Sequence, residues 1–232
     1  MMSASALELD HLIVAARTLE EGARHIAETL GVEPVPGGAH TRMGTHNMLL
    51  GLFGTVYLEV IAIDPDAEND GGPANGRPPR WFALDEEAMQ ARLEAGPFLA
   101  HWAVRVARPK DLGRWQAQYS SRIPPVVPMS RGDLTWRLTV PEDGAFPSWQ
   151  GAGDGILPTL IQWDTAVHPA ARLPASGLAL SALKARHPRP ALIREQLQWL
   201  GANHLIELDD AAADAPALAA DIETPAGMRV LR

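Results

Sequence analysis

Two histidines and one glutamate stand where strands would normally carry apolar side chains. His11 lies in the segment LDHLIVA, His101 in LAHWAVRV and Glu59 in YLEVIAI. Because side chains alternate along a strand, each of the three shares a face with apolar neighbours. A buried carboxylate without a partner is costly, so Glu59 requires a metal ion, a histidine or an arginine beside it. The pattern predicts a metal or small-molecule site, or a polar cluster in which the three residues bond to one another.

The elements that would position these residues occur as repeats. Seven residues after His11, the helix cap Thr18 opens an amphipathic helix that ends at Gly31. The pattern restarts near residue 99, where a helix start again follows seven residues after His101. A third restart begins near residue 178, with Leu180 in the place of the two histidines. The first two copies therefore carry the candidate ligands, and the third keeps only the architecture.

Several segments carry a family resemblance. LDHLIVAA, VPGGAHTRMGTHNMLLGL, YLEVIAID, WFALD and LIQWDTAVHPA resemble the glyoxalase-like family of the vicinal oxygen chelate (VOC) superfamily. The resemblance implies an α+β fold in which repeated βαβββ modules form a cup-shaped, mostly antiparallel sheet. We expect a glyoxalase-like VOC domain over 1–170, with paired modules at about 7–64 and 97–170 and a linker with a short helix at 65–96. Residues 171–232 are expected to form a partial VOC-like module packed on the same unit.

The resemblance also implies a metal site. Ligands in VOC enzymes come from the first and last strands of each module, which by position gives His11 and Glu59, and then His101 and Gln162. Gln162 departs from the usual pattern, because an acidic ligand is common there and an amide oxygen binds a divalent ion more weakly. Two imidazoles, a carboxylate and an amide oxygen suit Zn, Ni, Mn, Fe or Co. Such an ion would act as a Lewis acid while an adjacent base moves a proton.

Other candidates surround this set. Glu59 and His46, the latter in the segment GTHN, are the candidate catalytic residues. Arg105 shares a strand face with His101 and is placed to hold a substrate anion. Tryptophan side chains are suited to the wall of an apolar pocket. The expected substrate pocket contains Asn47, Arg105, Trp136 and Trp163.

The composition favours a soluble protein whose partner is neither nucleic acid nor membrane. The 232 residues carry a formal net charge of −8 and no basic run, whereas either partner calls for a basic face. No segment approaches the roughly 20 apolar residues of a membrane span. The absence of cysteine excludes disulfides and fits a reducing compartment. We expect a cytoplasmic protein and, because self-association covers sheet edges, a homodimer.

These observations leave three functions open, and with them the question of whether the protein is an enzyme. The first is a divalent-metal-dependent lyase or isomerase that acts on a small oxygenated substrate. The second is a metal-free protein of the same fold that binds or sequesters a small molecule. The third is an iron-dependent ring-cleaving dioxygenase, since two histidines and one carboxylate are the usual ligands of such iron.

Overall fold

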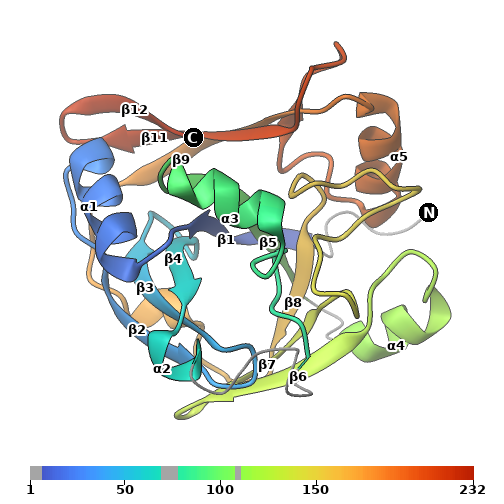
Figure 1. Cartoon of the computed structure of the whole chain (residues 1–232), viewed down its shortest axis with the longest axis horizontal. Coiled ribbons are helices and arrows are strands. Elements are labelled where there is room, and N and C mark those ends of the chain that lie inside the picture. Colours follow the sequence, from blue (N-terminus) through green and yellow to red (C-terminus); the bar gives the residue numbers. More distant parts are fainter. Residues whose placement is uncertain (1–6, 69–77, 108–110) are drawn as a thin grey trace.

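The computed structural model describes residues 7–68, 78–107 and 111–232. Its main element is an eight-stranded sheet that curls into a cup, with strand order β2-β3-β4-β1-β5-β8-β7-β6 (Figure 1). The first half contains β1 (Leu7–Ala15), α1 (Leu19–Leu30), β2 (Val35–His40), β3 (Thr45–Gly51) and β4 (Tyr57–Ile63). The second half contains β5 (Phe98–Val106), α4 (Leu112–Gln118), β6 (Val126–Arg131), β7 (Leu134–Thr139) and β8 (Thr159–Trp163). The predicted α+β fold with a mostly antiparallel cup is confirmed.

Helix α1 shows how local sequence places the strand that carries Glu59. The Thr18 hydroxyl accepts a hydrogen bond from the backbone N–H of Glu21 at 3.2 Å, which confirms the predicted cap. Gly31 ends the helix in the left-handed conformation. A Cβ at Gly22 would lie 2.3 Å from the side chain of Val60, so this glycine lets the helix approach β4 closely.

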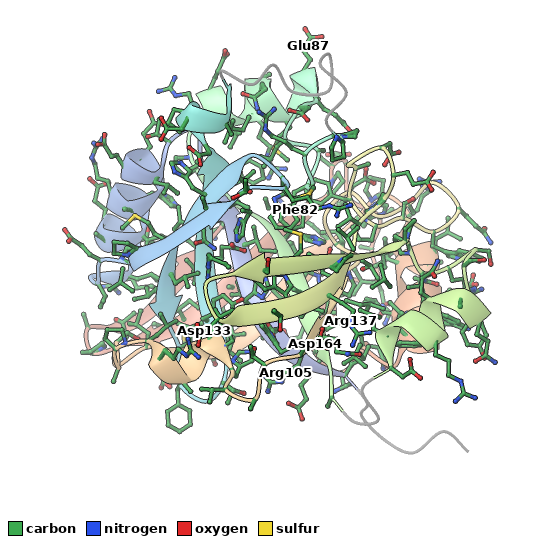
Figure 2. The ribbon with its side chains drawn as sticks, turned by 90° about the horizontal axis from the view of Figure 1, so that it is seen from below. Phe82, Glu87, Arg105, Asp133, Arg137 and Asp164 are labelled. Atoms are coloured by element: carbon green, nitrogen blue, oxygen red, sulfur yellow. The ribbon has the colours of Figure 1, made fainter. Side chains whose placement is uncertain are left out.

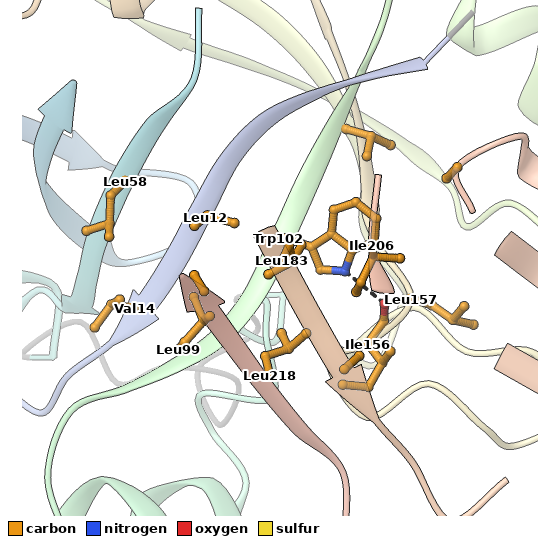
Figure 3. Close-up of a cluster of buried hydrophobic side chains, with 14 of the residues drawn as sticks. Leu12, Val14, Leu58, Leu99, Trp102, Ile156, Leu157, Leu183, Ile206 and Leu218 are labelled. Atoms are coloured by element: carbon orange, nitrogen blue, oxygen red, sulfur yellow. Dashed lines mark hydrogen bonds between the residues drawn. The ribbon is translucent and has the colours of Figure 1, made fainter. Parts of the chain in front are cut away.

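The convex face of the cup is covered by the largest hydrophobic core. Leu12, Val14 and Leu58 from the first half pack there with Leu99 and Trp102 from β5 (Figure 3). The Trp102 indole N–H donates to the carbonyl of Ile156 at 2.8 Å, so this buried polar group is satisfied. Side chains on the alternate positions of the same strands point into the concave face, where a second core lies.

The C-terminal residues form a smaller sheet against the convex face. They fold as β9 (Ala179–Arg186), α5 (Pro190–Leu200), β10 (Glu207–Leu208), β11 (Ala217–Thr224) and β12 (Gly227–Leu231). The strand and helix order repeats that of the first half, but the pairing order is β10-β9-β11-β12, with β9 between two partners. Leu183 and Leu218 join the convex core (Figure 3), so this sheet covers the outside of the cup.

The connection between the halves closes part of the cup. It contains the short helices α2 (Pro65–Glu68) and α3 (Glu87–Glu94). The predicted helix over 81–95 begins later, because Phe82 and Ala83 have positive φ angles of 59° and 57° that a right-handed helix does not allow. Residues 81–84, here called the plug, are buried in the concave core (Phe82 is labelled in Figure 2). Within the ranges described, no helix is long and apolar enough to cross a membrane.

Candidate acid–base site

A β-bulge near the start of β1 turns two consecutive side chains toward the concave face. The pairing of β1 with β5 slips between Leu9 and His11, which leaves Asp10 as the extra residue. Leu9 therefore packs against the convex core, whereas Asp10 bonds to Trp163 of the concave core. The bulge places a carboxylate directly beside the imidazole of His11.

Asp10 is fully buried and accepts hydrogen bonds from three side chains. His11 Nδ1 lies 2.6 Å from Oδ1, and Trp163 Nε1 and His168 Nε2 lie 3.0 and 2.9 Å from Oδ2. The backbone N–H of Ala170 donates to His168 Nδ1, so Nε2 carries the proton that His168 donates to Asp10. Burial opposes ionisation, but the bonds from His11 and His168 outweigh it and hold the pKa of Asp10 well below its usual range.

His11 lies between two carboxylates. Its ring stacks on Tyr57 with centroids 4.7 Å apart, and its Nε2 is 3.5 Å from Oε2 of Glu59. Burial by itself would lower the pKa of His11, but the hydrogen bond and charge of Asp10 and the charge of Glu59 raise it above its ordinary value. The two carboxylates therefore favour the imidazolium form over the neutral ring. Asp10 fixes Nδ1 as a donor, which leaves Nε2 directed at Glu59.

Glu59 has a second set of contacts on its other oxygen. Asn47 Nδ2 donates to Oε1 at 2.5 Å, and His40 Nε2 lies 3.8 Å from the same atom. Arg131 Nη1 donates to Asn47 Oδ1 at 2.9 Å. Only 6% of the Glu59 surface is exposed, so these contacts replace water around the carboxylate.

His40 is held neutral beside this carboxylate. Its Nδ1 is 3.1 Å from the Thr45 hydroxyl, and its Nε2 accepts from Asn47 Nδ2 at 3.3 Å. Burial lowers the pKa of His40 to about 4, and the charge of Arg131 acts in the same direction. His40 therefore contributes a polar, uncharged wall next to Glu59.

His101 lies in the second half and is committed to its own surroundings. Its Nδ1 is 2.9 Å from the Gly155 carbonyl, and its Nε2 accepts from the backbone N–H of Thr159 at 3.2 Å. The ring is fully buried between Phe82 and Phe146, each with centroids 5.1 Å away. Burial lowers the pKa of His101 to about 3. Both nitrogens are engaged, so His101 does not present a free lone pair to the cup.

Strand register shows that Gln162 is not the counterpart of Glu59. Between β1 and β5, His11 pairs with Ala103 and Ile13 pairs with His101. On their other sides, Ile13 pairs with Glu59 of β4, and Ala103 pairs with Thr159 of β8. The approximate twofold relation of the two halves therefore matches Glu59 with Thr159. Gln162 lies on the opposite face of β8, where its Oε1 accepts from the backbone N–H of Leu112 at 2.9 Å. The offset between 159 and 162 is odd, and an odd offset along a strand changes the face.

The expected four-ligand metal centre does not fit these residues. His11 and Glu59 are together, and the carboxylate behind His11 is an arrangement common for metal-binding histidines. In His101 and Gln162, however, the atoms that would bind a metal ion are engaged in other hydrogen bonds. Over the part of the chain that the structure describes, no group of three or more His, Asp or Glu side chains is arranged to hold a metal ion.

A cavity of about 300 Å³ lies at the end of the cup where Asp10 is found. Its walls include two of the expected pocket residues, Arg105 and Trp163, as well as His168, which bonds to Asp10. Arg105 is itself paired with Glu8. In Figure 2, Phe82 of the plug and Arg105 lie in different parts of the molecule. A small molecule in this cavity would contact Trp163 and His168, the two lining side chains that bond to Asp10. The full lining is Thr55, Arg105, Val106, Ala107, Trp163, Thr165, Ala166 and His168.

The remaining expected residues divide between the site and the outside. Asn47 contacts Glu59 as described, and Trp136 packs between Trp163 and His40 with ring centroids 5.3 and 6.2 Å away. His46 alternates with Asn47 on β3 and shares a face with Met48, which packs against the convex core. The structure does not bring His46 to Glu59.

Sequence reasoning missed four residues of this site, namely Asp10, His40, Arg131 and Thr159. Asp10 had a usable signal, because an acidic residue next to a strand histidine is able to fix its tautomer. His40 follows the Gly-Gly pair at 37–38 and resembled a turn residue. Arg131 and Thr159 carried no signal, because only the closed cup brings them to the histidines.

The chain therefore forms a cup of paired βαβββ modules that encloses a buried cluster of acidic and histidine side chains. The chain belongs to the glyoxalase-like domain family, whose model matches residues 9–201. No curated protein matches the chain. Among solved structures, a hypothetical protein from Staphylococcus aureus is 16% identical, with a TM-score of 0.57 over 97% of this chain and 84% of that chain. Methylmalonyl-CoA epimerase from Mycobacterium tuberculosis is 18% identical, with a TM-score of 0.41 over 74% of this chain and 97% of that chain.

Proposed function

We propose that this protein moves a proton on a small oxygenated molecule, as an isomerase or lyase, with Glu59 as the base and His11 as its acid partner. The observation that carries the proposal is the buried series Asp10, His11 and Glu59, with contacts of 2.6 and 3.5 Å. Pairs of titratable groups whose surroundings set different protonation states are typical of proton-transfer sites.

The chemistry follows from the charges. A carbon next to a carbonyl group gives up a proton to the Glu59 carboxylate, and the C–H electron pair forms the double bond of an enolate. The carbonyl oxygen becomes negative and accepts a hydrogen bond or a proton from His11 Nε2. Return of the proton to carbon completes an isomerisation, and expulsion of a leaving group from the next carbon completes a lyase reaction. Asp10 keeps Nδ1 protonated throughout, which holds the ring in a productive orientation.

The family resemblance implies a divalent ion in addition to these residues. Because His101 and Gln162 do not fit the expected ligand set, we assign no step to a metal. The imidazolium of His11 supplies the positive charge at the carbonyl oxygen instead. The ring-cleaving dioxygenase has less support for the same reason, since the second histidine of its expected ligand set is His101, whose two nitrogens are engaged in other hydrogen bonds.

A metal-free binding protein is the second candidate. It is favoured by the burial of His11 and Glu59, each 6% exposed, and by Trp163 and His168, which bond to Asp10 and line the cavity. In that case a small molecule would occupy the cavity at Arg105 without reaching Glu59. Binding without turnover would identify this function.

Deuterium exchange tests the proposal. The protein is incubated in D2O with a panel of 2-oxo acids, hydroxy-aldehydes and acyl thioesters, all of which carry an acidic C–H beside a carbonyl. Mass spectrometry then measures deuterium at that carbon. We expect exchange of at least one panel compound by the wild type, and loss of about 100-fold or more in Glu59→Gln.

Glu21→Gln is the matched control, because Glu21 is a surface residue of α1 paired with Arg17. It is expected to exchange at the wild-type rate. Equal exchange by wild type and Glu59→Gln would contradict the assignment of the base. Exchange that is abolished by a chelator and restored by a divalent ion would return the metal to the mechanism.

A further inference from the structure

The two edge strands of the cup, β2 and β6, meet at a seam beside Glu59. Arg131 is the last residue of β6 and therefore belongs to the second half of the cup. Its Nη1 lies 2.9 Å from Asn47 Oδ1 and 3.4 Å from His40 Nε2, both of which belong to the first half. A side chain from one module thus reaches into the polar cluster of the other.

A pair of glycines on β2 makes room for this contact. A Cβ at Gly37 would lie 2.0 Å from Asn47 Oδ1, and a Cβ at Gly38 would lie 2.9 Å from Arg131 Cδ. Gly38 also has a φ of +147°, which side chains rarely adopt. Two adjacent positions are therefore without side chains at the point where Asn47 and Arg131 cross the seam.

The donor and acceptor pattern gives Asn47 a single orientation. Arg131 can only donate, so it binds the amide oxygen of Asn47. The amide nitrogen is then directed at Glu59 Oε1, at 2.5 Å, and at His40 Nε2, at 3.3 Å. Loss of the guanidinium would leave the Asn47 oxygen unpaired in a part-buried place and free the amide to move away from the carboxylate.

We propose that Arg131 is a positioning residue that acts through Asn47 to hold the Glu59 carboxylate in place for proton transfer. The proposal rests on the proposed function of Glu59. If Arg131 has this role, the site of the first module is complete only when the second module closes the seam between β2 and β6.

The test compares Arg131→Met and Arg131→Lys with the matched control Arg137→Met. Arg137 lies on β7 of the same hairpin and pairs with Asp164 at 2.7 Å on the surface (Figure 2). The side-chain NH2 signals of Asn47 are followed by NMR and assigned with Asn47→Ser. Deuterium exchange of a panel compound is measured at several concentrations on the same samples.

In Arg131→Met we expect the Asn47 signals to shift or broaden. We also expect the exchange rate at saturation to fall at least tenfold, while the half-saturating concentration changes less than threefold. Arg131→Lys should keep part of the wild-type Asn47 signals and part of the exchange rate. Arg137→Met should match the wild type in both measurements. A structural loss alone would not move the Asn47 signals selectively or be rescued by lysine.

Unchanged Asn47 signals in folded Arg131→Met would overturn the proposal, and so would the same response in Arg137→Met. If Arg131→Met does not fold, Arg131→Gln is measured in the same way, and unchanged Asn47 signals there have the same meaning. A wild type without exchange activity would count against the proposed function, whereas the Asn47 signals would still decide the role of Arg131.

Discussion

At the scale of the residue, three histidines in one cup differ in protonation because their surroundings differ. Two carboxylates raise the pKa of His11, whereas burial without a nearby full counter-charge lowers that of His101 to about 3. His40 lies near Glu59, but burial and the charge of Arg131 still lower its pKa to about 4. Of these three imidazoles, only His11 has its pKa raised, and only His11 has an acidic partner on each side.

Replacing the carboxylate behind His11 should change both its charge and its function. In Asp10→Asn the amide accepts a hydrogen bond but carries no charge, so we expect the pKa of His11 to fall. The deuterium exchange rate should fall about 100-fold, in the range typical of a lost general acid. NMR titration of the His11 ring checks the first effect. An unchanged His11 titration would show that Asp10 does not control its protonation.

From the burial of a neutral His101, we predict that the free energy of unfolding falls in mild acid. Its pKa is about 3 in the folded protein and 6.5 in the unfolded chain, so below pH 6.5 the unfolded chain binds a proton that the folded protein does not. The stabilising contribution is therefore complete above pH 6.5 and is lost as the pH falls toward 3. The expected slope approaches about 1.4 kcal/mol per pH unit for this one group.

Urea unfolding at pH 7, 6 and 5 measures this slope. In His101→Gln the amide is able to bond to the Gly155 carbonyl and the Thr159 N–H. The dependence of the unfolding free energy on pH should then be weaker, by up to the contribution of one bound proton. The exposed His204→Gln serves as the control and should retain the wild-type slope. The same slope in His101→Gln and wild type would contradict a neutral, buried His101.

At the scale of the element, the site depends on irregularities in otherwise regular strands. The bulge at Asp10 turns this carboxylate into the cup, and the Gly37–Gly38 pair opens β2 to side chains from β3 and β6. Phe82 and Ala83, with positive φ angles, seal the concave core with the plug. Such positions are expected at functional sites, where the backbone deviates from ideal geometry to place a side chain.

Much of the element pattern was predictable from the sequence, and the reasons for the failures are physical. The Thr18 cap and Gly31 act locally, so they defined α1 correctly. The bulge at Asp10 depends on pairing with β5, which no local pattern encodes. The expected position of Gln162 differs from the observed register, which pairs Ala103 with Thr159, because register is set by pairing across the sheet and an odd offset reverses the face.

Gly37→Ala tests the role of the glycine pair. The new Cβ would meet Asn47 Oδ1 at 2.0 Å, so we expect a loss of about 1–3 kcal/mol in the free energy of unfolding and displacement of Asn47 from Glu59. Gly113→Ala in α4 is the control, because nothing lies within 4 Å of its added Cβ. It should be neutral or stabilise by about 0.5–1 kcal/mol. Equal effects of the two substitutions in urea unfolding would remove the steric argument.

At the scale of the whole molecule, the cup and the C-terminal sheet share one core. Leu183 and Leu218 of the C-terminal sheet pack in the same cluster as Leu12 and Trp102 of the cup (Figure 3). The family match ends at residue 201, just after α5, so β10 to β12 lie beyond it. The sequence predicted a repeat here from its strand and helix order, but the pairing order depends on packing against the convex face. The homodimer stays a prediction.

The shared core predicts cooperative unfolding. Leu218→Ala should lower the free energy of unfolding by about 2–5 kcal/mol, because Leu218 is 5% exposed in the convex core. Tryptophan fluorescence and far-ultraviolet circular dichroism should then report a single coincident transition in both wild type and variant. Two separate transitions would show that the C-terminal sheet folds independently of the cup.

The most direct test of the account is the protonation state of His11 in the native protein at pH 7. Long-range ¹H–¹⁵N NMR of the imidazole rings, with His11 assigned by His11→Gln, distinguishes an imidazolium from either neutral tautomer. We predict protonated nitrogens on both sides of the His11 ring, and a neutral ring with Nδ1 protonated for His101 in the same spectrum. A neutral His11 with an unprotonated Nε2 would contradict the proposed acid–base pair with Glu59.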